Sequence, residues 1–408
     1  MSRGQLEGSW NALSYYTGVV ERADSTSSRR RAPRARAIAL LMLLCGGVPT
    51  AVPAQELAFP GGVIWQLRFD DPPVQLPAFD TDSAYLVMRD GRVRAIDHAT
   101  GTERWTAPAS ATVRPASSGR HLVGADGATA WSLDAASGRP AWQRDLGAAA
   151  AAAPVVTAPG AAFLTARGDL VLLAWADGRE VWRTPMPAPV SAPIAAGEDR
   201  IWVGLDDGRV LAIGLGDGKP AWTKALGARV LGVTAIGDRL FVGAADNFLH
   251  VLKAKGGDLA WRWRTGGDVA GHAVADARRV YYTSLDAMLR AHDRRRGDMR
   301  WQRPLTSRAV GGPLLAGTRL IVAGVSPELR AFRTSDGGME GFAPIPGRPL
   351  HDPFLAPETP SAPVRMVLLT AGGHFLAIGQ TVEPMLVPLD VIPGRTLPPE
   401  VLPDIIKR

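Results

Sequence analysis

The chain has 408 residues, of which 46% are hydrophobic and 21% are charged, and this composition excludes an intrinsically disordered protein. A single cysteine, Cys45, excludes a disulfide framework. The formal charge of +7 does not indicate nucleic-acid binding, because residues 1–54 hold seven arginines against three acidic residues and so carry +4 of it.

Residues 1–54 are predicted to be a secretory signal peptide. The basic stretch "RRRAPRAR" (29–36) precedes an apolar run of 12 residues (37–48) and a small-residue cleavage site that ends at Ala54. Twelve residues are well short of the roughly 20 that span a bilayer. We therefore expect no transmembrane segment in the mature chain. Residues 1–28 are either an over-extended gene start or an unusual n-region.

Cys45 lies inside this leader. A lipoprotein signal places a small residue directly before the modified cysteine, whereas Leu44 stands there, so an outer-membrane lipoprotein is the less favoured alternative. Cleavage after Ala54 removes Cys45, and the mature chain then has no thiol for disulfides, catalysis or metal binding. These observations predict a periplasmic or extracellular protein.

A unit of 37 to 41 residues repeats along most of the remaining chain. Its marker is Gly-x-x-x-Trp, and apolar strands separated by turns such as Asp90–Gly91 and Asp207–Gly208 precede each copy. The marker residues are Gly101 and Trp105, Gly138 and Trp142, Gly178 and Trp182, Gly218 and Trp222, Gly257 and Trp261, Gly297 and Trp301, with Phe342 as a variant in "GMEGF" (338–342).

This period is typical of a β-propeller blade of four short strands. Seven units end at the marker aromatic residue, and "RMVLLTAGGHFLAIG" (365–379) supplies two strands of an eighth. The strand around Trp65 (61–69) has no blade of its own and is predicted to close the ring on the last blade. The prediction is an all-β, eight-bladed propeller of four-stranded antiparallel blades over residues 55–387. Seven blades are the alternative if "PMLVPLD" (384–390) completes the last sheet.

The tryptophans are interpreted as wedges between blades, because one per repeat at a fixed place in the outer strand favours packing over a ligand platform. No catalytic or metal-binding residue is nominated. The seven histidines scatter over different repeats without metal-ligand spacing. His292, at a normally large apolar position, is interpreted as a structural histidine, with a titrating group beside Asp293 as the alternative.

Two further stretches resemble anion sites. "DRRRGD" (293–298) is interpreted as a solvated hairpin tip, with a phosphate or polyanion patch as the alternative. "GLGDGK" (214–219) lacks the glycine spacing, the Ser or Thr and the helix of a phosphate-binding loop. The proline-rich stretches 356–363 and 388–408 depart most from the repeat. The second is predicted to be a loosely ordered C-terminal tail, or alternatively a partner-binding one.

The strand, Asp-Gly turn, strand and Gly-x-x-x-Trp pattern resembles the PQQ-type repeat, which quinoprotein dehydrogenases share with the outer-membrane assembly lipoprotein family BamB. The BamB resemblance implies a non-enzymatic binding scaffold without cofactor, a monomer whose partners are envelope proteins. The quinoprotein resemblance implies the alternative, an oxidoreductase of alcohols or sugars that holds PQQ and calcium. Quinoproteins are usually longer and often carry adjacent cysteines, which the mature chain lacks. The scaffold is therefore our leading expectation.

Overall fold

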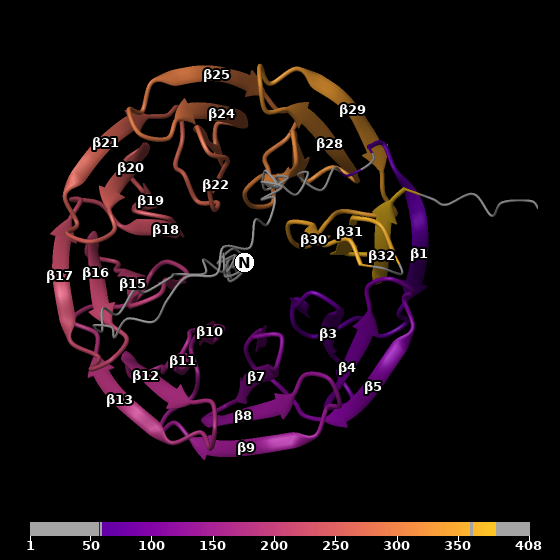
Figure 1. Ribbon diagram of the computed structural model, residues 1–408, viewed down its shortest axis with the longest axis vertical. Coiled ribbons are helices and arrows are strands. Elements are labelled where there is room, and N and C mark those ends of the chain that lie inside the picture. The colour runs from indigo at the N-terminus through magenta and orange to yellow at the C-terminus, as the bar shows by residue number, and fades with distance from the viewer. Residues whose placement is uncertain (1–56, 58, 360–361, 381–408) are drawn as a thin grey trace, which may run out of the picture.

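Apolar strands that alternate with glycine-containing turns fold into eight four-stranded antiparallel sheets in the computed structural model, which describes residues 57, 59–359 and 362–380. The sheets stand around a central axis as the blades of a propeller, and in every blade except blade 5 the innermost strand is the shortest (Figure 1). The described residues include no helix long and apolar enough to cross a membrane.

The first four blades follow one another along the chain, each with its four strands paired in sequence order. Blade 1 contains β2 (Ala78–Phe79), β3 (Ser83–Val87), β4 (Arg92–Asp97) and β5 (Glu103–Pro108), and blade 2 contains β6 (Ala116–Ser117), β7 (His121–Asp126), β8 (Thr129–Asp134) and β9 (Pro140–Asp145). Blade 3 contains β10 (Val155–Val156), β11 (Gly160–Leu164), β12 (Asp169–Ala174) and β13 (Glu180–Pro185), and blade 4 contains β14 (Ala195–Ala196), β15 (Arg200–Gly204), β16 (Arg209–Gly214) and β17 (Pro220–Ala225).

The next three blades repeat this order, and the last one recruits a strand from the other end of the sequence. Blade 5 contains β18 (Val230–Ile236), β19 (Arg239–Ala244), β20 (Phe248–Lys253) and β21 (Leu259–Arg264), and blade 6 contains β22 (Val274–Ala275), β23 (Arg279–Ser284), β24 (Met288–Asp293) and β25 (Met299–Pro304). Blade 7 contains β26 (Leu314–Ala316), β27 (Arg319–Ala323), β28 (Glu328–Arg333) and β29 (Met339–Pro344), and blade 8 contains β30 (Phe354–Ala356), β31 (Arg365–Leu369), β32 (His374–Gly379) and β1 (Gly62–Arg68).

The ring closes through β1, the outermost strand of blade 8. It pairs antiparallel with β32, from Gly62 opposite Gly379 to Arg68 opposite His374, and Figure 1 shows it beside the last strands of the chain. The eight-bladed architecture and its closure by the strand around Trp65 are thus confirmed. The seven-bladed alternative is wrong, because β1 occupies the outer position that "PMLVPLD" would have taken; that stretch lies outside the described residues.

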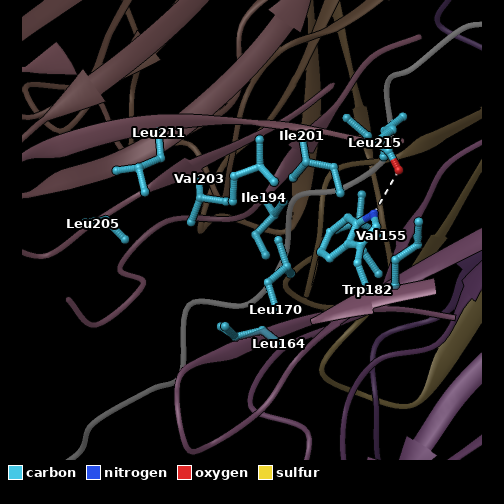
Figure 2. Close-up of a cluster of buried hydrophobic side chains, with 14 residues drawn as sticks. Val155, Leu164, Leu170, Trp182, Ile194, Ile201, Val203, Leu205, Leu211 and Leu215 are labelled. Atoms are coloured by element: carbon cyan, nitrogen blue, oxygen red, sulfur yellow. Dashed lines mark hydrogen bonds between the residues drawn. The ribbon is translucent and has the colours of Figure 1, made fainter. Parts of the chain in front are cut away.

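The hydrophobic core lies between blades and not within any one of them. In Figure 2, Val155, Leu170 and Trp182 of blade 3 pack against Ile201 and Leu211 of blade 4. Both faces of each sheet meet a neighbour, so the middle strands are buried on both sides, and every residue of β3 and β11 is buried. This packing explains why these strands are continuously apolar and do not alternate with polar residues.

In several blades a small residue on the third strand faces the tryptophan on the fourth, whereas Leu172 faces Trp182 in blade 3. Ala95 faces Trp105 and Ala212 faces Trp222, and the same pairing joins Ala291 to Trp301. A β-bulge follows each of these small residues directly. The bulge rotates the outer strand locally.

Candidate functional site

Each motif tryptophan contacts the next blade. Its indole Nε1–H donates to a backbone carbonyl there, and Figure 2 shows Trp182 with its ring nitrogen directed at the Leu215 carbonyl. The donor–acceptor pairs are Trp65 with His98 (2.8 Å), Trp105 with Ala135 (3.0 Å), Trp142 with Trp175 (3.0 Å), Trp182 with Leu215 (2.8 Å), Trp222 with Ala254 (3.1 Å), Trp261 with Arg294 (3.2 Å) and Trp301 with Thr334 (3.0 Å).

The motif glycine lies against the tryptophan of the preceding blade, not against its own. Gly218 has a φ of 68°, and a Cβ atom there would stand 2.6 Å from Cδ2 of Trp182. The other pairs are Gly101 with Trp65, Gly138 with Trp105, Gly178 with Trp142, Gly257 with Trp222, Gly297 with Trp261 and Gly337 with Trp301. The motif therefore marks the contact between two neighbouring blades, where a side chain on the glycine would collide with the tryptophan ring.

The assignment of Phe342 to the tryptophan position of blade 7 needs correction. Gly341 faces Ala331, as Trp301 faces Ala291 in blade 6, whereas Phe342 is 54% exposed. The register is shifted by one residue because Gly337, not Gly338, is the glycine packed on Trp301.

The N-terminal segment occupies the place of the missing indole. The atoms nearest to a Cβ on Gly341 would belong to Pro60 (3.7 Å) and Phe59 (3.9 Å). Leu57 is fully buried in the core between blades 7 and 8, and Phe59 packs against the same core. Arg319 Nη1 donates to the Leu57 carbonyl at 2.7 Å. The segment thus replaces a tryptophan wedge.

His292 is buried and fully engaged in hydrogen bonds within its blade. Its Nδ1 lies 2.9 Å from the Gly297 carbonyl and its Nε2 lies 3.1 Å from the Tyr282 hydroxyl. Burial lowers the pKa of the ring, so the neutral form donates through Nδ1 and accepts through Nε2. This geometry favours the structural interpretation over a titrating pair with Asp293, whose carboxylate instead bonds Arg300 at 2.7 Å.

The two glycine-rich or basic turns have different surroundings. In 214–219 the Asp217 carboxylate accepts from the backbone N–H of Lys219 at 3.1 Å, inside the hairpin between β16 and β17. In 293–298 the Arg294 guanidinium donates to the Ile236 carbonyl of blade 5 at 3.0 Å. Asp293 and Arg295 line an open hollow of about 460 Å³ together with residues of the β22–β23 turn.

The remaining sequence candidates lie partly or wholly outside the described residues. Within 356–363, the described ends meet through a bridge between Thr359 and Ala362. The predicted signal peptide (1–54) and the predicted tail (388–408) lie outside the described residues.

A buried polar cluster near the axis escaped the sequence interpretation. Arg114, His272 and Asp352 each stand two residues before an innermost strand, β6, β22 and β30. His272 Nδ1 lies 3.4 Å from Asp352 Oδ2, although blade 7 separates their blades. Such a contact is possible only where the blades converge. An alignment of the repeats could have found the cluster, because other copies hold the uncharged residues Ala153, Pro193 or Gly312 at this position.

Burial governs the ionisation of this cluster. It raises the pKa of Asp352 to about 7 and lowers that of His272 to about 4. Burial, with the Arg114 charge as a second cause, lowers the pKa of His351 to about 3. The His272–Asp352 contact is therefore a pair of neutral groups at mildly acidic pH. We define these four residues (Arg114, His272, His351 and Asp352) as the axial cluster.

The axial cluster does not fit a calcium-bound quinone. Calcium takes six to eight oxygen ligands, mostly carboxylates and carbonyls. Asp352 is the one carboxylate of the cluster, and Gly311 packs so closely that a Cβ there would stand 2.2 Å from Asp352 Oδ2. The described residues contain no group of three His, Cys, Asp or Glu side chains that could hold a metal ion.

Comparisons with known proteins agree with this architecture. A family model described as outer membrane protein assembly factor BamB matches residues 57–118, 89–164, 166–270 and 262–382. BamB of Yersinia pestis is 28% identical over 239 residues, a match that covers 50% of this chain and 60% of that relative. The chain thus spans about three fifths of that curated relative.

Solved structures share the fold at low sequence identity. The structure of BamB from Moraxella catarrhalis has a TM-score of 0.65 at 18% identity, covering 78% of this chain and 99% of that one. Sqt1 of Saccharomyces cerevisiae has a TM-score of 0.67 at 11% identity, covering 79% and 99%. At such identities the likeness concerns the fold alone.

Proposed function

Because the chain belongs to the family of the outer membrane protein assembly factor BamB, we propose that it is a non-enzymatic scaffold that binds envelope proteins during the assembly of outer-membrane proteins. The observation that carries this proposal is the extent of the family match, which runs from residue 57 to residue 382 and includes all eight blades. We place the protein in the periplasm and expect it to act as a monomer.

The construction of the ring suits such a scaffold. The repeated motif residues lie in the joints between blades, where they form the indole hydrogen bonds and the glycine contacts described above. The turns at the two ends of the blades carry little of the core, so they can vary in sequence without loss of the fold. Binding specificity therefore belongs to these turns.

The alternative, a PQQ-dependent oxidoreductase, has less support from the residues present. The axial cluster offers one carboxylate where a calcium site needs several oxygen ligands. We propose that the protein works without a cofactor.

One experiment separates the two functions. The full chain, exported to the periplasm of a Gram-negative bacterium with a C-terminal tag, is purified and heated with and without PQQ and calcium. We expect no thermal stabilisation and no dye-linked oxidation of alcohols or sugars, and we expect an outer-membrane assembly protein to co-purify. A stabilisation by PQQ and calcium accompanied by turnover would establish the enzyme and refute the scaffold.

A further inference from the structure

Blade 6 departs from the other repeats at its β24–β25 turn, which lies beside the β22–β23 turn at the same end of the blade. Between β24 and β25 the three residues before the motif glycine are arginines, 294–296. Arg278 lies in the β22–β23 turn, and Arg279 is the first residue of β23, a position that is also arginine in blades 4, 5 and 7. The equivalent three residues of blades 1–5 and 7 read HAT, AAS, WAD, LGD, AKG and TSD, with Lys255 as the one lysine or arginine. Arg294 has a structural contact, because its guanidinium donates to the Ile236 carbonyl of blade 5. Since the other blades form the same turn without arginine, the turn itself does not explain Arg295 and Arg296.

The two turns enclose the open hollow of about 460 Å³. It is lined by Ala277, Arg278, Arg279, Asp293, Arg295 and Arg300. The volume is within the range of small-ligand sites, roughly 300–1,000 Å³. Four of the six lining side chains are guanidinium groups, so the hollow is a concave and basic surface.

Side-chain caps hold both turns in place. Asp276 Oδ1 accepts from the backbone N–H groups of Arg278 (2.7 Å) and Arg279 (2.6 Å). Asp293 Oδ1 accepts in the same way from Arg295 (3.0 Å) and Arg296 (2.9 Å). These bonds fix the backbone from which the arginines project, so less conformational entropy is lost when a ligand binds.

The positive charge of the hollow is mostly uncompensated. Arg300 pairs with Asp293 at 2.7 Å, whereas Arg279 Nη1 donates to the neutral Thr334 carbonyl at 2.6 Å. Arg278 and Arg295 take part in no ion pair of 4.0 Å or less with any described residue. Three guanidinium charges around one hollow repel each other until an anion joins them.

We propose that this hollow binds a phosphomonoester or diphosphate group. The planar guanidinium presents paired donors that match phosphate oxygens, and several arginines around one concavity suit a compact, multiply charged anion. A phosphomonoester carries a charge of roughly −1.5 to −2 near neutral pH, which offsets most of the excess. A phosphorylated soluble compound and a lipid headgroup present the same chemistry.

The test measures binding of inorganic pyrophosphate to the purified protein by titration calorimetry. In R278Q/R295Q the backbone caps remain, because they involve main-chain N–H groups, and we expect affinity to fall by roughly tenfold or more. The matched control is R139Q/R179Q, which removes the same charge from exposed positions in the turns of blades 2 and 3 and should leave affinity unchanged. Equal melting temperatures of the variants exclude misfolding as the cause.

Vesicle flotation with phosphatidylcholine, with and without phosphatidic acid, identifies the source of the phosphate. Binding that needs phosphatidic acid, Arg278 and Arg295 assigns the site to a lipid headgroup, and pyrophosphate binding without flotation assigns it to a soluble compound. The proposal is overturned if pyrophosphate does not bind, if both double variants lose affinity equally, or if a polyglutamate peptide binds as tightly as pyrophosphate. The last result would assign the hollow to an acidic protein segment.

Discussion

At the scale of single residues, the joints between blades depend on the contact of a glycine with a tryptophan. Gly218 combines a left-handed backbone with a position where a Cβ would lie 2.6 Å from the Trp182 ring. Both features exclude a side chain, because an L-residue with positive φ is strained and the ring has no room to retreat. The joint therefore tolerates glycine alone.

We predict that G218A destabilises the protein by roughly 2–4 kcal/mol, from backbone strain and displacement of Trp182. The matched control is G216A, two residues away, where an added Cβ would meet no atom within 4 Å. It should change the free energy of unfolding by less than about 1 kcal/mol. Urea unfolding of the two variants checks this, and equal losses would contradict the role of the joint.

A second prediction concerns Asp352, whose pKa is raised by burial from 3.8 to about 7. Between about pH 4 and pH 7 the unfolded chain releases this proton while the folded chain keeps it, so this group makes the protein less stable as pH rises. Asparagine stays neutral. The melting temperature of D352N relative to wild type should therefore be higher at about pH 8 than at about pH 5.

The histidines of the axial cluster act in the opposite direction, since their lowered pKa values add stability as pH rises from about 3 for His351, or about 4 for His272, to about 6.5. They are present in both proteins, so the comparison of D352N with wild type isolates the carboxyl group. A difference in melting temperature that is the same at both pH values would show that Asp352 ionises normally.

At the scale of elements, Leu57, Phe59 and Pro60 replace the tryptophan that β29 lacks. Phe59 packs on the core between blades 7 and 8, while Phe342 on β29 is 54% exposed. Substituting alanine for each phenylalanine in turn tests which of the two fills the tryptophan position of blade 7.

We predict that F59A costs roughly 1–3 kcal/mol, less than for a fully buried phenylalanine because Phe59 is half-buried. F342A should cost less than about 0.5 kcal/mol. Thermal or urea unfolding of both variants checks this. A larger loss of stability for F342A than for F59A would show that Phe342 does occupy the tryptophan position, as the sequence predicted.

The blades were predictable from the sequence because the glycine, the tryptophan and the apolar strands recur at a nearly constant spacing in most copies. Phe342 was misplaced because "DGGMEGF" offers two adjacent glycines, and only packing on Trp301 selects Gly337. The axial cluster was not predictable, since His272 and Asp352 are 80 residues apart in sequence and meet only when the ring closes. The period of the repeat predicts the strands within each blade, but it does not predict which side chains of different blades meet near the axis.

At the scale of the whole molecule, β1 pairs with β32 and gives blade 8 its outermost strand, so the first and last described strands of the chain lie in one sheet. The closed ring fixes the turns of all eight blades on a common frame. A rigid frame with variable turns suits a protein that binds several surfaces at once. The arginine-lined hollow of blade 6 is one specialised turn pair on this frame.

The central claim, that this propeller is a binding scaffold for outer-membrane assembly, is tested most directly by site-specific photo-crosslinking in growing cells. A photoreactive amino acid is placed singly at exposed turn positions around both ends of the ring. We predict cross-links to an outer-membrane assembly protein from a contiguous group of positions at one end. Cross-links to no such protein, from any position at either end, would contradict the account.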